Sequence, residues 1–238
     1  MRQTIMNLKR SICIFAMMSA LGVSANAAEK VNPSSYIVTV KRTEICTAAS
    51  GGECVTLGSG VQQFDIASAS VGATVGNYIT NFTLPEDKIF THIKTTISRS
   101  FSITAIATTQ QDGAADDLCS TTGAGVVTAS STSQAASQVT ANGTASAQTF
   151  VVPDTTAANV TQATQEALYS AQGIELINSD EMIFTKALST PVDTSQPSPP
   201  PSIDISFGTA NTLEFNTASA TDCFAYLSGA PSMTISFQ

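Results

Sequence analysis

The chain has 238 residues and a formal net charge of −8, and charged side chains make up only 12% of it. An acidic chain with few cations argues against a nucleic-acid-binding protein, because a phosphate backbone requires a positive surface. Beyond the first 27 residues there is no long apolar run, so we expect no transmembrane helix.

The first 27 residues have the features of a secretory signal peptide. Three basic residues precede an apolar run from Ile12 to Val23, and a small-x-small cleavage pattern ends at Ala27. Cleavage there removes three cations and no acid, which leaves 211 residues with a formal net charge of −11. We therefore expect an exported protein, located in the periplasm, on the cell surface or outside the cell.

Four cysteines remain after Cys13 is removed with the leader, namely Cys46, Cys54, Cys119 and Cys223. An even number of cysteines in an exported chain predicts two disulfides, for which three pairings exist. We favour Cys46–Cys54 as a short staple around a Gly-Gly turn and Cys119–Cys223 as a long-range tie. A metal site is the alternative, but the spacing lacks C-x-x-C pairs and no histidine lies nearby in the sequence.

Alternating apolar and polar residues predict strands in the first part of the mature chain. A half-buried strand is expected over 35–46, followed by a turn through 47–53 and a second strand over 54–57. A Gly-Ser-Gly sequence at 58–60 predicts a break before a further strand near Phe64.

The longest alternation runs from Ile89 to Ala105, after a turn sequence at 84–87. Odd-numbered positions are mostly apolar and even-numbered positions polar, as in one extended strand or two strands joined by a β-bulge. Arg99 falls among the apolar positions, so we place the bulge or the strand end there.

Two later segments are expected outside the sheets, and one is expected to be helical. Residues 130–146 are almost entirely small and polar. Such a segment buries too little apolar surface to offset the entropy lost on ordering, which predicts an exposed loop. Residues 190–202 contain five prolines and predict an extended connector, since proline cannot donate to a β-ladder. Residues 155–172 carry apolar side chains at helical spacing, with Asp154 suited to the N-cap and Gly173 to the C-terminal cap.

Short alternating patterns near 203–207, 213–215, 223–227 and 233–237 complete the chain. Many short strands joined by polar turns predict an all-β fold, an antiparallel Ig-like or prealbumin-like β-sandwich with one short helix and disulfide staples. We expect a single domain over 28–238, with two small β lobes as the alternative. The strand at 233–237 is expected to close the protein's own sandwich, and self-association by strand exchange is the alternative.

No pattern in the sequence predicts an enzyme. His92 is the only histidine, so any Ser-His-Asp triad or multi-histidine zinc site would have to be built on it. It lies among polar positions of the long alternation, which favours a surface histidine. Neither G-x-S-x-G nor H-E-x-x-H occurs, and the absence of Trp with only 4 Tyr removes the aromatic platforms of glycosidases and lectins.

A loop before Cys119 carries the one candidate metal site. Asp112, Asp116 and Asp117 could ligate calcium, which accepts carboxylate oxygens in irregular geometry. Their spacing does not match an EF-hand, and an acidic loop that is merely solvated is the alternative. No other cofactor is expected. Asp180 and Glu181 form a second acidic pair, which a β-turn explains without chemistry.

The segment from Tyr36 to Ile103 resembles an uncharacterised group of secreted bacterial β-sandwich proteins. The similarity lies in the Tyr36-x-Val38-x-Val40 strand, Cys46 and Cys54, the run Phe64 to Ala67, the element Gly76 to Tyr78, and the step Arg99-x-Phe101. The resemblance implies a sandwich fold and transfers no catalytic residue.

These observations together predict an exported, non-enzymatic β-sandwich with a structural or surface role, as an adhesion module or appendage subunit. A periplasmic or secreted protein that binds a small ligand or calcium is the first alternative. A hydrolase built from carboxylates alone is the second.

Overall fold

The computed structural model describes most of the chain after the expected signal peptide. The described residues are 29–67, 82–109, 117–123, 126–128, 139–141, 144–152, 167, 169–195, 203–219, 222–227 and 231–237. The leader and its cleavage site lie outside them.

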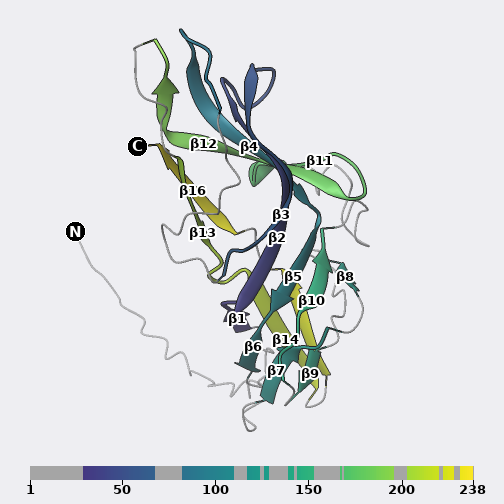
Figure 1. The fold of residues 1–238 in the computed structure, drawn as a ribbon. Helices are drawn as coiled ribbons and strands as arrows, with labels where there is room; N and C mark the ends of the chain where they lie inside the picture. Colours follow the sequence, from purple (N-terminus) through teal and green to yellow (C-terminus); the bar gives the residue numbers. More distant parts are fainter. Residues whose placement is uncertain are drawn as a thin grey trace, which may run out of the picture.

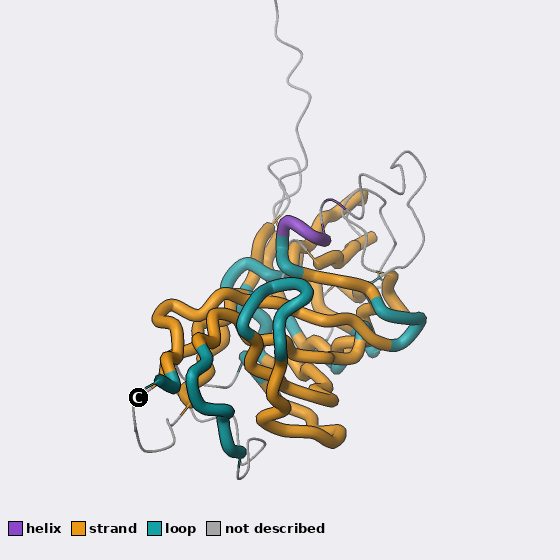
Figure 2. The backbone as a smooth tube through the Cα atoms, turned by 90° about the horizontal axis from the view of Figure 1, so that it is seen from above, coloured by secondary structure: helices purple, strands orange, loops and turns teal. Residues whose placement is uncertain are grey.

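The described chain is an all-β, largely antiparallel fold with one short helical segment, which confirms the predicted fold class (Figures 1 and 2). Whether the sandwich is Ig-like or prealbumin-like stays a prediction. The strands are β1 (Glu29–Val31), β2 (Ser35–Cys46), β3 (Cys54–Asp65), β4 (Ile89–Ser98), β5 (Ser100–Thr104), β6 (Ile106–Thr109), β7 (Asp117–Thr121), β8 (Val126–Thr128), β9 (Val139–Ala141), β10 (Gln148–Val151), β11 (Ile174–Leu176), β12 (Glu181–Asp193), β13 (Ile203–Gly208), β14 (Leu213–Ser219), β15 (Asp222–Leu227) and β16 (Ser232–Phe237).

The larger of the two main sheets is built around β2. One edge of β2 pairs with β3, and the other edge pairs with β5 over residues 35–37 and with β4 over residues 40–46. Beyond β4 the sheet continues with β12 and β11, whereas beyond β5 it continues with β10 and β8. The sheet therefore divides between β4 and β5, at Arg99.

Burial along β2 follows the predicted alternation and then changes phase. Tyr36 and Val40 are buried as expected. The ladders that β2 forms with β3 and with β4 both shift register between Val40 and Arg42. After this bulge Thr43 and Ile45 are buried, which keeps them on the face that Val40 occupies, and Cys46 at the end of the strand is buried as well.

The expected break at 58–60 is wrong, because β3 continues through it. Gly60 has a φ of +114°, and the β2–β3 ladder shifts register beside it. A side chain other than glycine rarely adopts this backbone conformation, so the glycine sequence forms a bulge inside a strand rather than a loop.

The second sheet has six strands in the order β1-β14-β15-β9-β7-β6, and the chain enters it from the large sheet at a corner. The corner is Ala105, between β5 and β6. The Ala105 amide donates to Thr121 Oγ1 at 3.1 Å, and the Thr121 amide donates to the Ala105 carbonyl at 3.0 Å. Thr121, which is fully buried, thus satisfies the backbone groups that the change of sheet leaves without ladder partners.

The expectation of an exposed loop over 130–146 is wrong for β9, which lies within that segment. β9 pairs with β7 on one side and with β15 on the other, so it occupies an interior position of the second sheet. Val139 and Thr140 have side chains that favour strands, and a ladder on each side lets a short segment take strand geometry. Residues 129–138 lie outside the described part of the chain.

The last four strands form one long hairpin. The pairs Ile203↔Phe237, Gly208↔Ser232 and Leu213↔Leu227 share one register, so β13 and β14 lie opposite β16 and β15 on either side of a turn at 209–212. The half made of β14 and β15 belongs to the second sheet. The half made of β13 and β16 separates as a two-stranded sheet beside β12 (Figure 1).

The buried side chains form two clusters, and β2 and β4 contribute to both. The first core cluster lies between the two main sheets and contains Tyr36, Val38, Val40, Ile66, Phe101, Ile103, Ala105, Ala107, Cys119, Phe150, Val152, Met182, Leu213, Phe215 and Ala225, with Ile97 packed against it. The second core cluster lies farther along the large sheet and contains Ile45, Leu57, Phe90, Ile93 and Leu188.

The predicted connector and helix agree with the structure only in part. β12 runs through Pro191 to Asp193, so the expectation that the connector starts at residue 190 is wrong. Pro191 lies where the β12–β4 ladder is irregular, between Ala187 and Val192, and an irregular ladder tolerates a missing donor. The chain is helical at Tyr169 to Ala171 and stops before Gly173, which has the positive φ expected of a C-terminal cap. Most of the expected helix, and the connector prolines at 197 and 199–201, lie outside the described residues.

Candidate functional site

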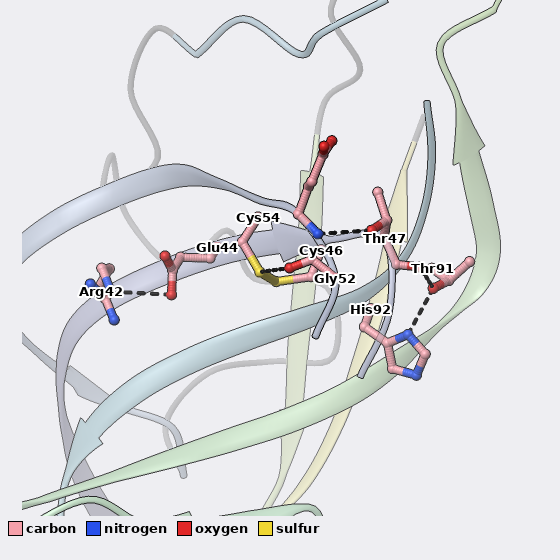
Figure 3. Close-up of a disulfide and its surroundings, with 9 residues drawn as sticks. Arg42, Glu44, Cys46, Thr47, Gly52, Cys54, Thr91 and His92 are labelled. Carbon is pink, nitrogen blue, oxygen red and sulfur yellow. Dashed lines mark hydrogen bonds and ion pairs between the residues drawn. A yellow bond between two sulfur atoms is a disulfide. The ribbon is translucent and has the colours of Figure 1, made fainter. Parts of the chain in front are cut away.

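The disulfide at the end of the β2–β3 hairpin is the clearest chemical feature of the described chain. Cys46 ends β2, Cys54 begins β3, and the two residues are paired directly across the ladder. Their sulfur atoms are bonded at 2.07 Å and their Cα atoms are 4.1 Å apart, which confirms the predicted staple (Figure 3). Cys46 is fully buried, whereas Cys54 is exposed.

The turn that the disulfide closes is held by its first and last residues. The Thr47 amide donates to the Glu53 carbonyl at 2.9 Å, and the Glu53 amide donates to Thr47 Oγ1 at 3.0 Å. The Glu53 carboxylate forms an ion pair with Lys88 at 2.7 Å. Backbone, side chain and disulfide therefore fix the same turn.

His92 lies next to this turn, because it is the residue of β4 that pairs with Cys46. Its Nδ1 atom is 2.8 Å from Thr91 Oγ1, and Thr91 Oγ1 is 2.7 Å from the Thr47 carbonyl oxygen (Figure 3). A carbonyl can only accept, so the single hydroxyl proton of Thr91 points to Thr47 and the hydroxyl accepts from His92. The geometry therefore places a proton on Nδ1 of His92. We call Thr47, Thr91 and His92 the tip network.

Within the described part of the chain, no carboxylate is hydrogen-bonded to His92 in the tip network, so the network does not form a Ser-His-Asp type of triad. The predicted surface histidine is half-buried, and its described hydrogen bond is to Thr91. Nothing in the sequence indicated that a threonine hydroxyl would connect this histidine to the hairpin turn, because the contact joins residues 44 positions apart.

Arg99 occupies the point where the large sheet divides, as its position among apolar residues predicted. Its side chain is 2% exposed. Its Nε and Nη2 atoms donate to the Val152 carbonyl at 2.9 and 2.5 Å, and Nη1 donates to the Asn178 carbonyl at 2.7 Å. The guanidinium thus joins the end of β10 to the turn before β12.

Lys41 and Glu181 join two strands across β4, close to Arg99. The Lys41 ammonium is 2.7 Å from the Glu181 carboxylate. The hydrogen bond from Lys41, followed by one from Asn178, lowers the pKa of Glu181 below its ordinary value. Asn178 Oδ1 also accepts from the amides of Asp180 and Glu181, which forms the turn expected for this acidic pair.

Cys119 also forms a disulfide, and it is fully buried in β7. Cys223 lies on β15 of the same sheet, where its backbone pairs with Val139. The side chain of Cys223 is outside the described part of the structure, so the Cys119–Cys223 bond stays a prediction.

The expected calcium site falls largely outside the described residues. Asp112 and Asp116 are not among them, and Asp117 is described only as the first residue of β7. Within the described part of the chain, no group of three or more His, Cys, Asp and Glu side chains is placed to hold a metal ion. Calcium binding by Asp112, Asp116 and Asp117 therefore stays a prediction.

No helix among the described residues is both long enough and apolar enough to cross a membrane. Comparison of the chain with protein-family models, with curated proteins and with solved structures finds no match. The resemblance to secreted bacterial β-sandwich proteins accordingly remains an expectation from the sequence.

Proposed function

We propose that the chain is an exported, non-enzymatic β-sandwich protein with a structural or surface role, as an adhesion module or an appendage subunit. The observation that carries this proposal is the exposed surface of β3. Between Cys54 and Phe64 this strand has no charged side chain, and Val61 is 74% exposed. Among the described strands β3 forms a ladder with β2 alone.

A strand of this kind suits contact with another protein. Sheets that remain monomeric commonly protect such strands with lysine or other charges, because exposed uncharged strands associate. On β3 the exposed positions Ser59, Gln62 and Gln63 are polar but uncharged. We take a second copy of the chain as the partner, since a homopolymer is what the appendage role requires.

The placement of the described ionic groups agrees with this role. Arg99 donates hydrogen bonds to backbone carbonyls, and the Lys41–Glu181 ion pair joins β2 to β12. Lys88 forms an ion pair with Glu53 at the hairpin turn. These groups join strands that are distant in sequence. They give the large sheet fixed geometry, which a load-bearing or adhesive module needs.

The test is the assembly state of the purified mature protein, measured by light scattering and negative-stain electron microscopy. We expect oligomers or filaments that V61K weakens at least about tenfold, because a buried lysine at the contact is strongly disfavoured. The control is I106K, which changes an apolar residue of β6 that is 46% exposed. Deletion of 232–238 tests whether the last strand contributes to assembly.

A strictly monomeric protein would contradict the appendage role. If the melting temperature of that monomer also rises with calcium, a calcium-binding protein becomes the better conclusion. Loss of assembly in I106K as well as V61K would show that β3 is not the contact.

A further inference from the structure

The Cys46–Cys54 disulfide and the only histidine of the chain are connected by the tip network. Thr47 follows Cys46 directly, and its carbonyl accepts the Thr91 hydroxyl, which in turn accepts from His92 Nδ1. Cys46 and His92 are also paired across the β2–β4 ladder. A backbone movement at Cys46 can therefore displace His92 in two ways, through the Thr47–Thr91–His92 hydrogen bonds and through the β2–β4 ladder.

The two sulfur atoms differ in access to solvent. Cys46 is fully buried beside Ile45 of the second core cluster, whereas Cys54 is exposed at the start of β3. Thiol–disulfide exchange proceeds by attack of a thiolate on the sulfur that it can reach. An external thiol consequently meets Cys54 and is kept from Cys46.

We infer that Cys46–Cys54 is an exchangeable disulfide, opened by attack of an external thiol at Cys54, and that its state determines the hydrogen bonding of His92. This inference is independent of the proposed structural role. It assigns Cys54 as a modification site and Thr91 as the residue through which the redox state acts on the histidine.

The exchange balances as two steps with a low-molecular-weight thiol as the reductant. A thiolate attacks Cys54 Sγ, a new S–S bond forms there, and the electron pair of the broken bond leaves on Cys46 Sγ, which takes a proton from water. A second thiolate then attacks the external sulfur, which releases Cys54 as a thiolate that takes a proton. The protein gains two electrons and two protons, and two external thiols become one disulfide.

Opening the disulfide frees the end of the hairpin. The turn over 47–53 then depends on the two Thr47–Glu53 hydrogen bonds and on the exposed Glu53–Lys88 ion pair, which contributes little in water. When the Thr47 carbonyl moves, the Thr91 hydroxyl is no longer fixed as an acceptor for Nδ1. The His92 ring then loses the constraint that places its proton on Nδ1.

The first experiment locates the attack. The full chain, oxidised, is incubated with glutathione, quenched with acid, digested and analysed by mass spectrometry. We expect the mixed disulfide on Cys54 to exceed that on Cys46 by about tenfold or more, because access decides which sulfur is attacked. Equal modification of the two, or modification of buried Cys119 before Cys54, would overturn the assignment.

The second experiment reads His92, whose signals are unambiguous because the chain contains one histidine. Long-range ¹H–¹⁵N correlation spectra at a pH where imidazole is neutral distinguish the Nδ1–H tautomer from the Nε2–H tautomer. In the oxidised chain we expect the Nδ1–H pattern. In C46S/C54S, which keeps Cys119 and its partner, we expect that pattern to be lost.

Two threonine variants separate the tip network from a general loosening of the fold. T91V keeps the disulfide but removes the hydroxyl, so we expect its histidine pattern to be the same before and after reduction. T39V changes a half-buried threonine of β2 outside the network and should keep the wild-type response. An Nδ1–H pattern that survives in C46S/C54S, or a T91V histidine that still responds to reduction, would show that the disulfide does not act through Thr91.

Discussion

Arg99 shows how a single side chain can join two branches of a sheet. Where β4 ends and β5 begins, the neighbouring strand changes from β12 to β10, and both flanking segments leave carbonyl groups directed at the gap. The Arg99 guanidinium donates to the carbonyls of Val152 and Asn178 there. Its planar fork of five donors suits this task better than the single ammonium of lysine.

Replacement of Arg99 should therefore be among the most damaging substitutions on the large sheet. We expect R99M to lower the free energy of unfolding by about 2–4 kcal/mol, since buried carbonyls lose charged hydrogen-bond donors. Urea denaturation, followed by circular dichroism, measures this free energy of unfolding. R42Q is the matched control, because Arg42 is half exposed and pairs with Glu44, and a change below about 1 kcal/mol is expected there. Equal losses in the two variants would contradict the role of Arg99.

Gly173 is required by both its backbone conformation and its surroundings. Its φ is +75°, and a Cβ atom at this position would collide with the Thr185 carbonyl oxygen. The Gly173 carbonyl also accepts from the Thr185 amide at 2.7 Å, which holds the two backbones together. The helix end and β12 therefore approach each other more closely than an alanine allows.

This close approach distinguishes Gly173 from a glycine that only needs a positive φ. We expect G173A to destabilise the fold by more than the roughly 1–2 kcal/mol of left-handed backbone strain alone. G51A is the matched control, since Gly51 has a φ of +67° with nothing within 4 Å of a Cβ. Thermal denaturation of both variants gives the comparison, and a G173A loss no larger than that of G51A would contradict the argument.

At the scale of elements, three irregularities of the large sheet lie at one level. Gly60 on β3, the bulge after Val40 on β2 and Arg99 between β4 and β5 all occur near the start of β12. The Lys41–Glu181 ion pair crosses the sheet at the same level. Bulges bend and twist strands, so this line marks where the sheet passes from the first core cluster to the second.

The ion pair at this level should give a measurable pH response. The pKa of Glu181 is lowered in the folded chain by the hydrogen bond from Lys41, so Glu181 contributes stability above its unfolded pKa and loses it as pH falls through its folded pKa. We expect K41M to raise the Glu181 pKa toward its ordinary value. The wild-type advantage over K41M should then disappear at acid pH. Titration of the Glu181 carboxyl ¹³C resonance measures this pKa. The control is K186M, which changes an exposed lysine of β12. A Glu181 pKa that is the same in K41M and in the wild type would contradict the coupling.

The sequence predicted the elements whose pattern is local. Tyr36 and Val40 are buried as their alternation indicated, Cys46 and Cys54 form the predicted disulfide, and Arg99 interrupts the long alternation. Each of these features depends on residues a few positions apart, or on a polar residue that breaks a regular apolar pattern.

The features that the sequence did not predict depend on neighbours distant along the chain. The sequence around Gly60 predicts a loop, but the ladder with β2 makes this glycine part of a β-bulge. Pro191 is accommodated in a strand because the β12–β4 ladder is irregular beside it. At the start of the long alternation Ile89 is exposed and Phe90 buried, the reverse of the expected parity. That reversal also lies opposite the irregular part of β12.

At the scale of the whole molecule, the two core clusters share strands, and this bears on the expected single domain. Val40 pairs with Ile97 beside the first core cluster, and Ile45 pairs with Ile93 in the second, so both clusters lie along the same two strands. Loss of one cluster therefore removes packing from strands that the other cluster also uses, and independent opening would require the line of bulges to act as a boundary. The ion pair and Arg99 oppose such separation.

We therefore expect the two clusters to unfold together. F90A in the second cluster and F150A in the first should each lower the free energy of unfolding by about 3–5 kcal/mol, because both side chains are almost fully buried. Tyrosine fluorescence, to which buried Tyr36 contributes in a chain without tryptophan, reports on the first cluster, and the His92 proton resonances report on the hairpin end near the second. In a single cooperative domain both probes shift to the same urea midpoint in both variants. If F90A moved the His92 midpoint alone, the line of bulges would be a boundary between two lobes, and the single-domain expectation would be wrong.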